Sequence, residues 1–163
     1  MTARDRDREF VEFARAQATG LRRTAYLLCH DWHLAQDLTQ IALAKMYVAW
    51  NRLDTLANPG AYARKTLLRA FLDHQRKRSS RETALELAPE TTVDAGPELR
   101  LTLLDALAEL PPRDRAIVVL RYWEDHSIDT VAALLGVSVS VVKSQSMRSL
   151  ARLRELLGED ILT

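Results

Sequence analysis

The sequence predicts an all-α protein made of two small helical domains that are joined by a flexible acidic linker. Apolar residues recur at helical spacing along most of the 163 residues, and no stretch alternates as a strand does. Between residues 82 and 98 every charged residue is acidic, and two prolines and a glycine interrupt the segment. The predicted boundaries are a first domain at 1–80, a linker at 81–97, a second domain at 98–158 and a tail at 159–163.

Composition limits the class of protein. With 47% hydrophobic residues the chain can bury two cores, and its net charge of +1 is too small for binding to a polyanion by bulk charge. The single cysteine excludes an intramolecular disulfide. No apolar run approaches the roughly 20 residues that span a bilayer, and MTARDRDREF is followed by no apolar segment of a secretory signal. We therefore expect a cytoplasmic protein without a membrane partner.

The first domain is predicted to contain three helices, at residues 7–29, 32–51 and 58–79. His30 and Asp31 break the first helix, and Asn58 followed by Pro59 is a typical helix start. Apolar residues at helical spacing predict the inner faces. They are Phe10, Phe13, Ala14, Leu21, Ala25 and Leu28, then Leu34, Leu38, Ile41 and Val48, then Ala63, Leu67, Ala70 and Phe71. Beside the second of these faces lies a polar ridge of Asp37, Gln40 and Lys45.

The third helix has the strongest local charge of the first domain. Seven basic residues lie between positions 64 and 81 against one acidic residue, Asp73, and Trp50 and Tyr62 stand near them. Basic groups among aromatic rings favour phosphate contacts and the stacking of an unpaired base. The alternative is a solvated basic helix end that complements the helix dipole, which explains Arg64 and Lys65 in the first turn poorly.

The second domain is predicted to contain four helices. The first two lie at about 97–110 and 112–123, separated by Pro111 and Pro112, with Ile117, Leu120 and Trp123 on the apolar side of the second. Ser127 and Ser138 are good N-caps for the last two helices, and Gly136 lies between them, where a helix end favours a left-handed residue.

The last helix presents a polar and basic outer face of Ser140, Lys143, Ser144, Gln145, Arg148 and Arg152. A short helix, a glycine turn and such a second helix are typical of a helix-turn-helix that enters the DNA major groove. An ordinary αα-hairpin with a solvated face is the alternative.

Taken together, these segments resemble bacterial sigma factors of the extracytoplasmic-function group, in the sigma-70 family, and most of all the sigma-E-like subgroup common in actinobacteria. LRRTAYLLCHDWHLAQDLTQIALAKMYVAW at 21–50 and NPGAYARKTLLRAFLDHQRKR at 58–78 resemble the two parts of their region 2. Residues 106–155 resemble region 4. The segment LPPRDRAIVVLRYWED and the pattern at 35–40 are the most specific matches.

The resemblance implies a promoter-specificity subunit of RNA polymerase. Asp37, Leu38, Gln40 and Ile41 are then the contacts with core polymerase, whose β′ clamp helices and β flap are the docking sites. The first domain would read the −10 element as it melts and would capture an extruded base, which costs a few kcal/mol to unstack. The candidate −10 contacts are Asn58, Tyr62, Arg64, Lys65, Arg69, Arg76 and Lys77. The candidate −35 contacts are Ser138, Ser140, Lys143, Ser144, Gln145, Arg148 and Arg152. An anti-sigma protein is left open as a further partner.

Three positions depart from the family pattern. Arg69 stands where members commonly have Asn, Gln145 where they often have Arg, and Ser140-Val141 where they often have Gly-Thr. Since Gln favours adenine edges and Arg favours guanine, these changes affect the expected promoter sequence rather than the role.

A stand-alone regulator and an enzyme or metal protein are the two alternative classes of protein. A stand-alone regulator would bind duplex DNA tightly without polymerase, whereas a sigma factor would bind weakly alone. An enzyme or metal protein would need a site, and Cys29, His33 and Asp37 have ligand types that zinc accepts. The break at 30–31 should turn them apart, so we expect no metal, no cofactor and no catalytic residue.

Overall fold

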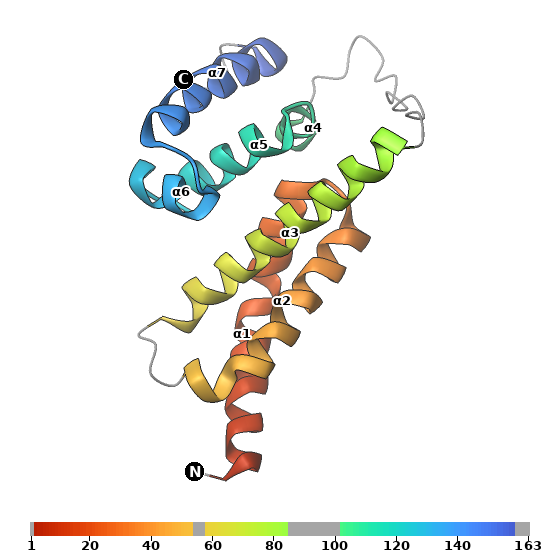
Figure 1. Ribbon diagram of the computed structural model, residues 1–163, viewed down its shortest axis with the longest axis vertical. Coiled ribbons are helices and arrows are strands. Elements are labelled where there is room, and N and C mark those ends of the chain that lie inside the picture. The colour runs from red at the N-terminus through yellow and green to blue at the C-terminus, as the bar shows by residue number, and fades with distance from the viewer. Residues whose placement is uncertain (1, 54–57, 85–101, 159–163) are drawn as a thin grey trace. The chain divides into compact units, whose positions relative to one another are not determined.

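The computed structural model describes residues 2–53, 58–84 and 102–158, and these parts are helical with short turns and contain no strand (Figure 1). The chain divides into two compact units, Met1–Lys77 and Arg78–Thr163. The predicted all-α class is therefore confirmed. Residues 85–97 of the predicted linker and the tail at 159–163 lie outside the described residues.

Unit 1 consists of α1 (Ala3–Cys29), α2 (Trp32–Leu53) and α3 (Pro59–Ala84) as far as Lys77. α1 begins with a capping box in which the Thr2 hydroxyl and backbone N–H donate to the Asp5 carboxylate, and these hydrogen bonds lower the pKa of Asp5. It ends because His30 adopts a left-handed conformation, with φ 56°. Asp31 then caps α2 by accepting from the backbone N–H of His33, at 2.9 Å.

The buried core of unit 1 takes residues from all three helices. It is made of Leu21, Ala25 and Leu28, of Ala35, Leu38, Ala42 and Met46, and of Ala63, Leu67, Leu68, Ala70 and Phe71. The inner face predicted for α3 is confirmed. That predicted for α2 is partly wrong, because Ile41 is 44% exposed and Val48 is 78% exposed. The small side chains of Ala35 and Ala42, which lie on a neighbouring face of the helix, are buried in the interior instead.

An aromatic cluster joins the start of α1 to the end of α2. The Phe10 ring lies 5.1 Å from Tyr47 and 5.4 Å from Trp50, and Phe13 lies 5.0 Å from Trp50. The Tyr47 hydroxyl donates to the Asp7 carboxylate at 3.0 Å, and this hydrogen bond to an anion raises the pKa of Tyr47 above its usual value. Arg6 donates to the side-chain oxygen of Asn51 at 2.8 Å. The two helix ends are therefore held together by both apolar and polar contacts.

α3 continues to Ala84, beyond the predicted end at residue 79 and into the predicted linker. No helix breaker stands between Ser79 and Ala84, and the first proline after α3 is Pro89.

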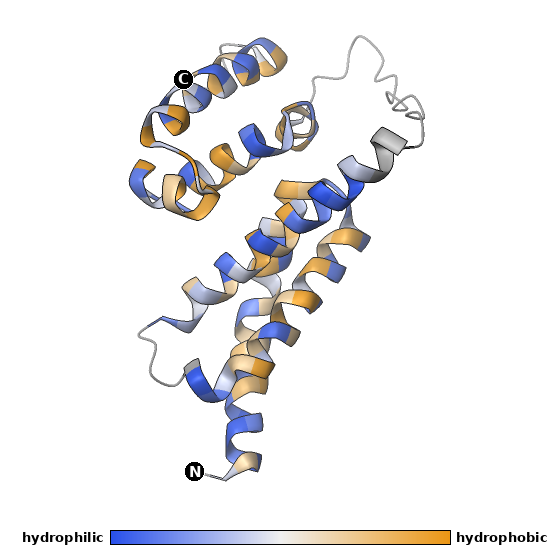
Figure 2. Cartoon of the chain, viewed as in Figure 1, coloured by the Kyte–Doolittle hydropathy of each residue, from blue (hydrophilic) through white to orange (hydrophobic). Residues whose placement is uncertain are grey.

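Unit 2 consists of α4 (Leu103–Ala108), α5 (Pro112–Val118), a single π-helical turn η1 (Val119–Trp123), α6 (Ile128–Leu135) and α7 (Val139–Leu157). The α4 helix begins later than the predicted residue 97, because Thr102 forms a capping box with Asp105. Orange and blue segments alternate along the helices in Figure 2, as expected for amphipathic elements with one buried face. The side chains of the unit that are most completely buried include Ile117, Val119, Val131, Val142 and Leu153.

The π-helical turn changes which side chains are buried at the end of α5. Glu124 donates its backbone N–H to Val119, five residues back, at 3.0 Å, and His126 donates to Leu120 at 2.9 Å. The wider turn alters the helical phase after Leu120. Leu120 is buried as predicted, but the prediction was wrong for Trp123, which is 56% exposed.

Candidate nucleic-acid interface

The hairpin of α6 and α7 has the local geometry of a helix-turn-helix. The Ser127 hydroxyl accepts from the Thr130 backbone N–H at 3.1 Å, and the Ser138 hydroxyl accepts from Val141 at 3.2 Å. Gly136 ends α6 with φ 67° and ψ 35°. The two helices meet at an angle of 105°. The caps and turn that the sequence predicted are therefore the ones that fix the direction of α7.

α7 carries a solvent-exposed face that is polar and basic. Ser140, Lys143, Ser144, Arg148 and Arg152 are exposed as predicted. Gln145, which was predicted on the same exposed face, is half-buried. Its Oε1 atom is fully buried and has no hydrogen-bond partner among the described residues. Arg152 donates to Glu155 at 3.1 Å, so part of its charge is neutralised within the helix.

Met147 lies on the same stretch of α7 and was not among the predicted contacts. Its side chain is 75% exposed, between Lys143 and Arg148 along the helix. A large apolar side chain that no core covers costs solvation free energy in the free protein, of about 25 cal/mol for each Å² exposed. Its position at helical spacing from Lys143 is a signal in the sequence that could have identified it.

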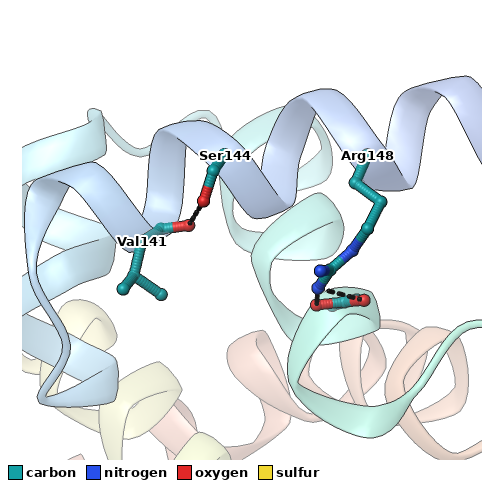
Figure 3. A network of polar contacts seen from close by, with 4 residues as sticks. Val141, Ser144 and Arg148 are labelled. Carbon is teal, nitrogen blue, oxygen red and sulfur yellow. Dashed lines mark hydrogen bonds and ion pairs between the residues drawn. The ribbon is translucent and has the colours of Figure 1, made fainter.

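Arg148 is partly engaged within unit 2. Its Nη2 atom donates to both carboxylate oxygens of Asp114 on α5, at 3.3 and 3.2 Å. Figure 3 shows the Arg148 side chain pointing from α7 towards this carboxylate, while Ser144 turns back to donate to the Val141 carbonyl. The Asp114 side chain is 8% exposed and that of Arg148 is 66% exposed. The contact therefore joins a buried anion to a largely solvated cation.

The neighbouring residue, Arg115, faces α4 instead. It is buried, and its guanidinium donates to the carbonyls of Leu107, Ala108 and Leu110 at 2.9, 3.2 and 3.0 Å. Leu107 and Ala108 are the last residues of α4 and Leu110 lies in the turn that follows; the Leu107 carbonyl also accepts from the Leu110 backbone N–H at 3.1 Å. Two consecutive residues of α5 thus connect this helix to α4 and to α7.

The basic surface of α3 is mostly solvent-exposed. Lys65, Arg69, Arg76 and Lys77 are exposed, Tyr62 is 36% exposed and Arg64 is half-buried. Arg76 forms an ion pair with Asp73. The Asn58 side chain accepts from the backbone N–H of Ala61 at 3.1 Å, so it serves as the α3 cap.

Of the four residues of α2 that were predicted to contact core polymerase, all but one are exposed. Asp37 and Gln40 are exposed and Ile41 is 44% exposed, but Leu38 is 1% exposed and belongs to the core. The prediction of Leu38 as a contact residue does not fit this burial. Exposed Ile41 and Val48 continue the ridge along the helix, so it combines polar and apolar side chains.

The residues considered for a metal site do not converge. Across 2–53, 58–84 and 102–158, no group of three His, Cys, Asp or Glu side chains could hold a metal ion. The Cys29 thiol donates to the Asp31 carbonyl at 3.3 Å instead. In the same ranges no single helix is long and apolar enough to cross a membrane; α6 and α7 reach that length and composition only as a bent pair.

Comparison with known proteins assigns the family. Residues 13–81 match the family model of sigma-70 region 2, and residues 100–153 match that of sigma-70, region 4. The chain is similar to the RNA polymerase sigma-E factor of Streptomyces coelicolor, with 40% identity over 94% of this chain and 89% of that protein. It is 32% identical to an extracytoplasmic-function sigma factor, SigE, of Mycolicibacterium smegmatis, over 91% of this chain and 61% of that protein.

A solved structure agrees in fold. The sigma factor RpoE, in complex with the anti-sigma factor NepR from Bartonella quintana, has a TM-score of 0.71 and 24% identity, over 91% of this chain and 96% of that one. The chain therefore belongs to the sigma-70 family of RNA polymerase sigma factors, in the extracytoplasmic-function group, as its sequence predicted. It directs promoter-specific initiation of transcription by RNA polymerase.

Proposed function

We propose that the two units divide promoter recognition, with α7 reading the −35 element in the major groove and α3 holding the melted −10 element. The observation that carries this assignment is the exposed face of α7, which presents Ser140, Lys143, Ser144 and Met147 on a helix fixed by its cap and its 105° turn. A helix of this diameter fits the major groove, and its N-terminal half is the part that meets base edges.

Each exposed group on α7 has a matching group on DNA. Lys143 supplies a cation for a phosphate or a guanine edge, and the hydroxyls of Ser140 and Ser144 can pair with any base edge. Met147 supplies an apolar surface for the 5-methyl group of thymine. Contact with that methyl group would cover the apolar side chain that solvent reaches in the free protein.

The −10 element is assigned to the basic surface of α3, defined by Tyr62, Arg64, Lys65, Arg69, Arg76 and Lys77. The exposed cations on this surface suit the phosphates of an unpaired strand, and the Tyr62 ring suits base stacking. Asn58 contributes as the cap that fixes the start of α3. The exposed residues Asp37, Gln40 and Ile41 of α2 are assigned to the β′ clamp helices of core polymerase, and unit 2 to the β flap.

The remaining assignments follow from that role. The chain supplies no catalytic group of its own and needs no cofactor, because polymerase performs the chemistry, and it acts in the cytoplasm, where polymerase meets promoter DNA. An anti-sigma protein is a further proposed partner, as the similar sigma factor of Bartonella quintana was solved with one.

The experiment removes the thymine methyl group and the methionine separately. Core polymerase carrying the wild-type chain or Met147→Ala is tested on promoter DNA in which each −35 thymine is replaced by deoxyuridine. We expect one replacement to weaken binding of the wild-type holoenzyme about threefold to tenfold and to leave the variant unaffected. Lys143→Ala should weaken binding to every sequence, whereas Arg154→Ala, a cation lost elsewhere on α7, should not. If Lys143→Ala binds as the wild type does, α7 does not face the DNA.

A further inference from the structure

Asp114 is an unusual neighbour for a DNA-binding surface. Its carboxylate is almost fully buried in the first turn of α5, and its ion-pair partner among the described residues is Arg148. A buried carboxylate near the phosphates of DNA would repel them unless a cation compensates its charge. Arg148 compensates it from α7, the helix assigned to the major groove.

The geometry of the pair limits what Arg148 can bind. A single nitrogen, Nη2, donates to both oxygens of Asp114. A guanidinium forks onto guanine O6 and N7 with either the Nη1 and Nη2 pair or the Nε and Nη2 pair. Both edges include Nη2, which Asp114 draws towards α5, so a fork onto guanine would have to share this nitrogen with the carboxylate.

The rest of the guanidinium remains available to an anion. Nη1 and Nε have no hydrogen-bond partner among the described residues, and the side chain is 66% exposed. A phosphate oxygen needs a cation and a single donor rather than a fork, and the N–H groups of Nη1 and Nε supply such donors.

We propose that Asp114 is a positioning residue that turns Arg148 into a phosphate clamp beside the −35 element, so that Arg148 does not read a base. This inference rests on the proposed function of α7. It differs from the sequence-based prediction, which placed Arg148 among residues that reach bases and phosphates alike. Asp114 acts only through Arg148, by holding its guanidinium over the start of α5 before DNA arrives.

The test is a double-mutant cycle on the DNA affinity of the complete holoenzyme. Core polymerase is combined with wild-type chain, Arg148→Ala, Asp114→Asn or the double variant, and affinity is measured at several salt concentrations on a set of single-base −35 variants. Arg148→Ala should weaken binding about tenfold on every sequence by the same factor, and should reduce the salt slope by about 0.9. In the Asp114→Asn background the same change should cost about threefold, because no buried carboxylate is then exposed to the phosphates.

Further variants separate this role from a purely structural one. Arg148→Lys keeps the charge and one donor, so its affinity should lie within about threefold of the wild type, with the same order of preference among −35 sequences. Thermal unfolding of the free chains shows which variants fold. If Arg148→Ala does not fold, DNA affinity is compared among the wild type, Arg148→Lys, Asp114→Asn and the double variant, which leaves no unpaired carboxylate.

Two results would overturn the inference. One is a tenfold change in preference at a single −35 base pair on removal of Arg148, since that would make Arg148 a base reader. The other is an equal effect of Arg148→Ala in both backgrounds, since Asp114 would then have only a structural role. If instead Lys143→Ala also leaves −35-dependent binding unchanged, the assignment of α7 itself fails, and this inference fails with it.

Discussion

At the scale of single residues, the consecutive charges Asp114 and Arg115 hold the second unit together. Arg115 is buried and donates to three carbonyls at the end of α4 and in the turn after it, while Asp114 pairs with Arg148 on α7. Both residues lie in the first turns of a helix of seven residues, Pro112–Val118. A helix this short gains little from its own hydrogen bonds, so these contacts between helices decide its position.

Arg115→Met should destabilise unit 2. The substitution keeps much of the apolar stem but removes the side-chain donor to the carbonyls of Leu107, Ala108 and Leu110, of which Leu107 keeps a backbone donor, the N–H of Leu110. We expect the free energy of unfolding to fall by on the order of 3 kcal/mol, because unpaired buried acceptors lose solvation as well as the hydrogen bond. Urea titration of the full chain measures it. Arg113→Met, at the exposed neighbouring position, is the matched control, and an equal loss in both variants would exclude the role given to Arg115.

Residue contacts were predictable from the sequence where they are local. Ser127 and Ser138 were identified as caps because their partners lie three residues away, and both caps are confirmed. The contact between Asp114 and Arg148 spans 34 residues. No local spacing indicates such a pair, so the sequence placed Arg148 on an outer face without its partner.

At the scale of elements, prediction succeeded where one apolar face dominates a helix. In α3 the basic residues leave only one face that is apolar enough to be buried, and the predicted residues Ala63, Leu67 and Phe71 are buried there. In α2 apolar residues cover more than one face. The sequence favoured the larger Ile41 and Val48, whereas the structure buries Ala35 and Ala42, since small side chains let helices approach closely. The prediction for Trp123 was wrong for another reason. A π-helical turn rotates the residues after it to a different side of the helix, and the spacing of apolar residues does not indicate such a turn.

The turn between α6 and α7 offers a test at this scale. Gly136 has φ +67°, and a Cβ atom added there would meet nothing within 4 Å. Gly136→Ala should therefore destabilise unit 2 by about 1 kcal/mol through backbone strain alone. Gly20 in α1 also has open space around it but no left-handed conformation, so Gly20→Ala should stabilise the chain by about 0.5–1 kcal/mol. Urea titration of both variants measures the change in the free energy of unfolding, which should be a decrease for Gly136→Ala and an increase for Gly20→Ala. An increase for Gly136→Ala would contradict the turn geometry.

At the scale of the whole molecule, two helical units from one chain serve one polymerase. The sequence predicted the family from segments that keep their order and spacing, and the matches to sigma-70 region 2 and sigma-70, region 4 confirm it. It could not predict how far each candidate contact is exposed. Gln145, predicted on the outer face of the last helix, is half-buried, because burial depends on neighbours that are distant in sequence. Leu38 is buried as its predicted inner-face position indicates, although it was also a predicted polymerase contact.

The α2 ridge should determine assembly with polymerase. Asp37→Ala combined with Gln40→Ala removes two exposed polar groups, and we expect affinity for core polymerase to fall at least tenfold while the fold is kept. Competition binding to purified core enzyme measures it. Glu9→Ala with Glu12→Ala, at exposed positions of α1, is the control for lost surface charge. Unaltered core binding in the ridge variant would remove the ridge from the interface.

The most direct test of the central claim compares promoter selectivity with and without core polymerase. Affinity is measured for a promoter taken from a run-off library and for the same DNA with its −35 or its −10 element scrambled. For the chain bound to core, we expect each scrambled element to lower affinity by at least tenfold, and for the chain alone we expect weak binding with little preference. Tight and equally selective binding by the chain alone would contradict the claim, since the chain would then read DNA as an independent regulator.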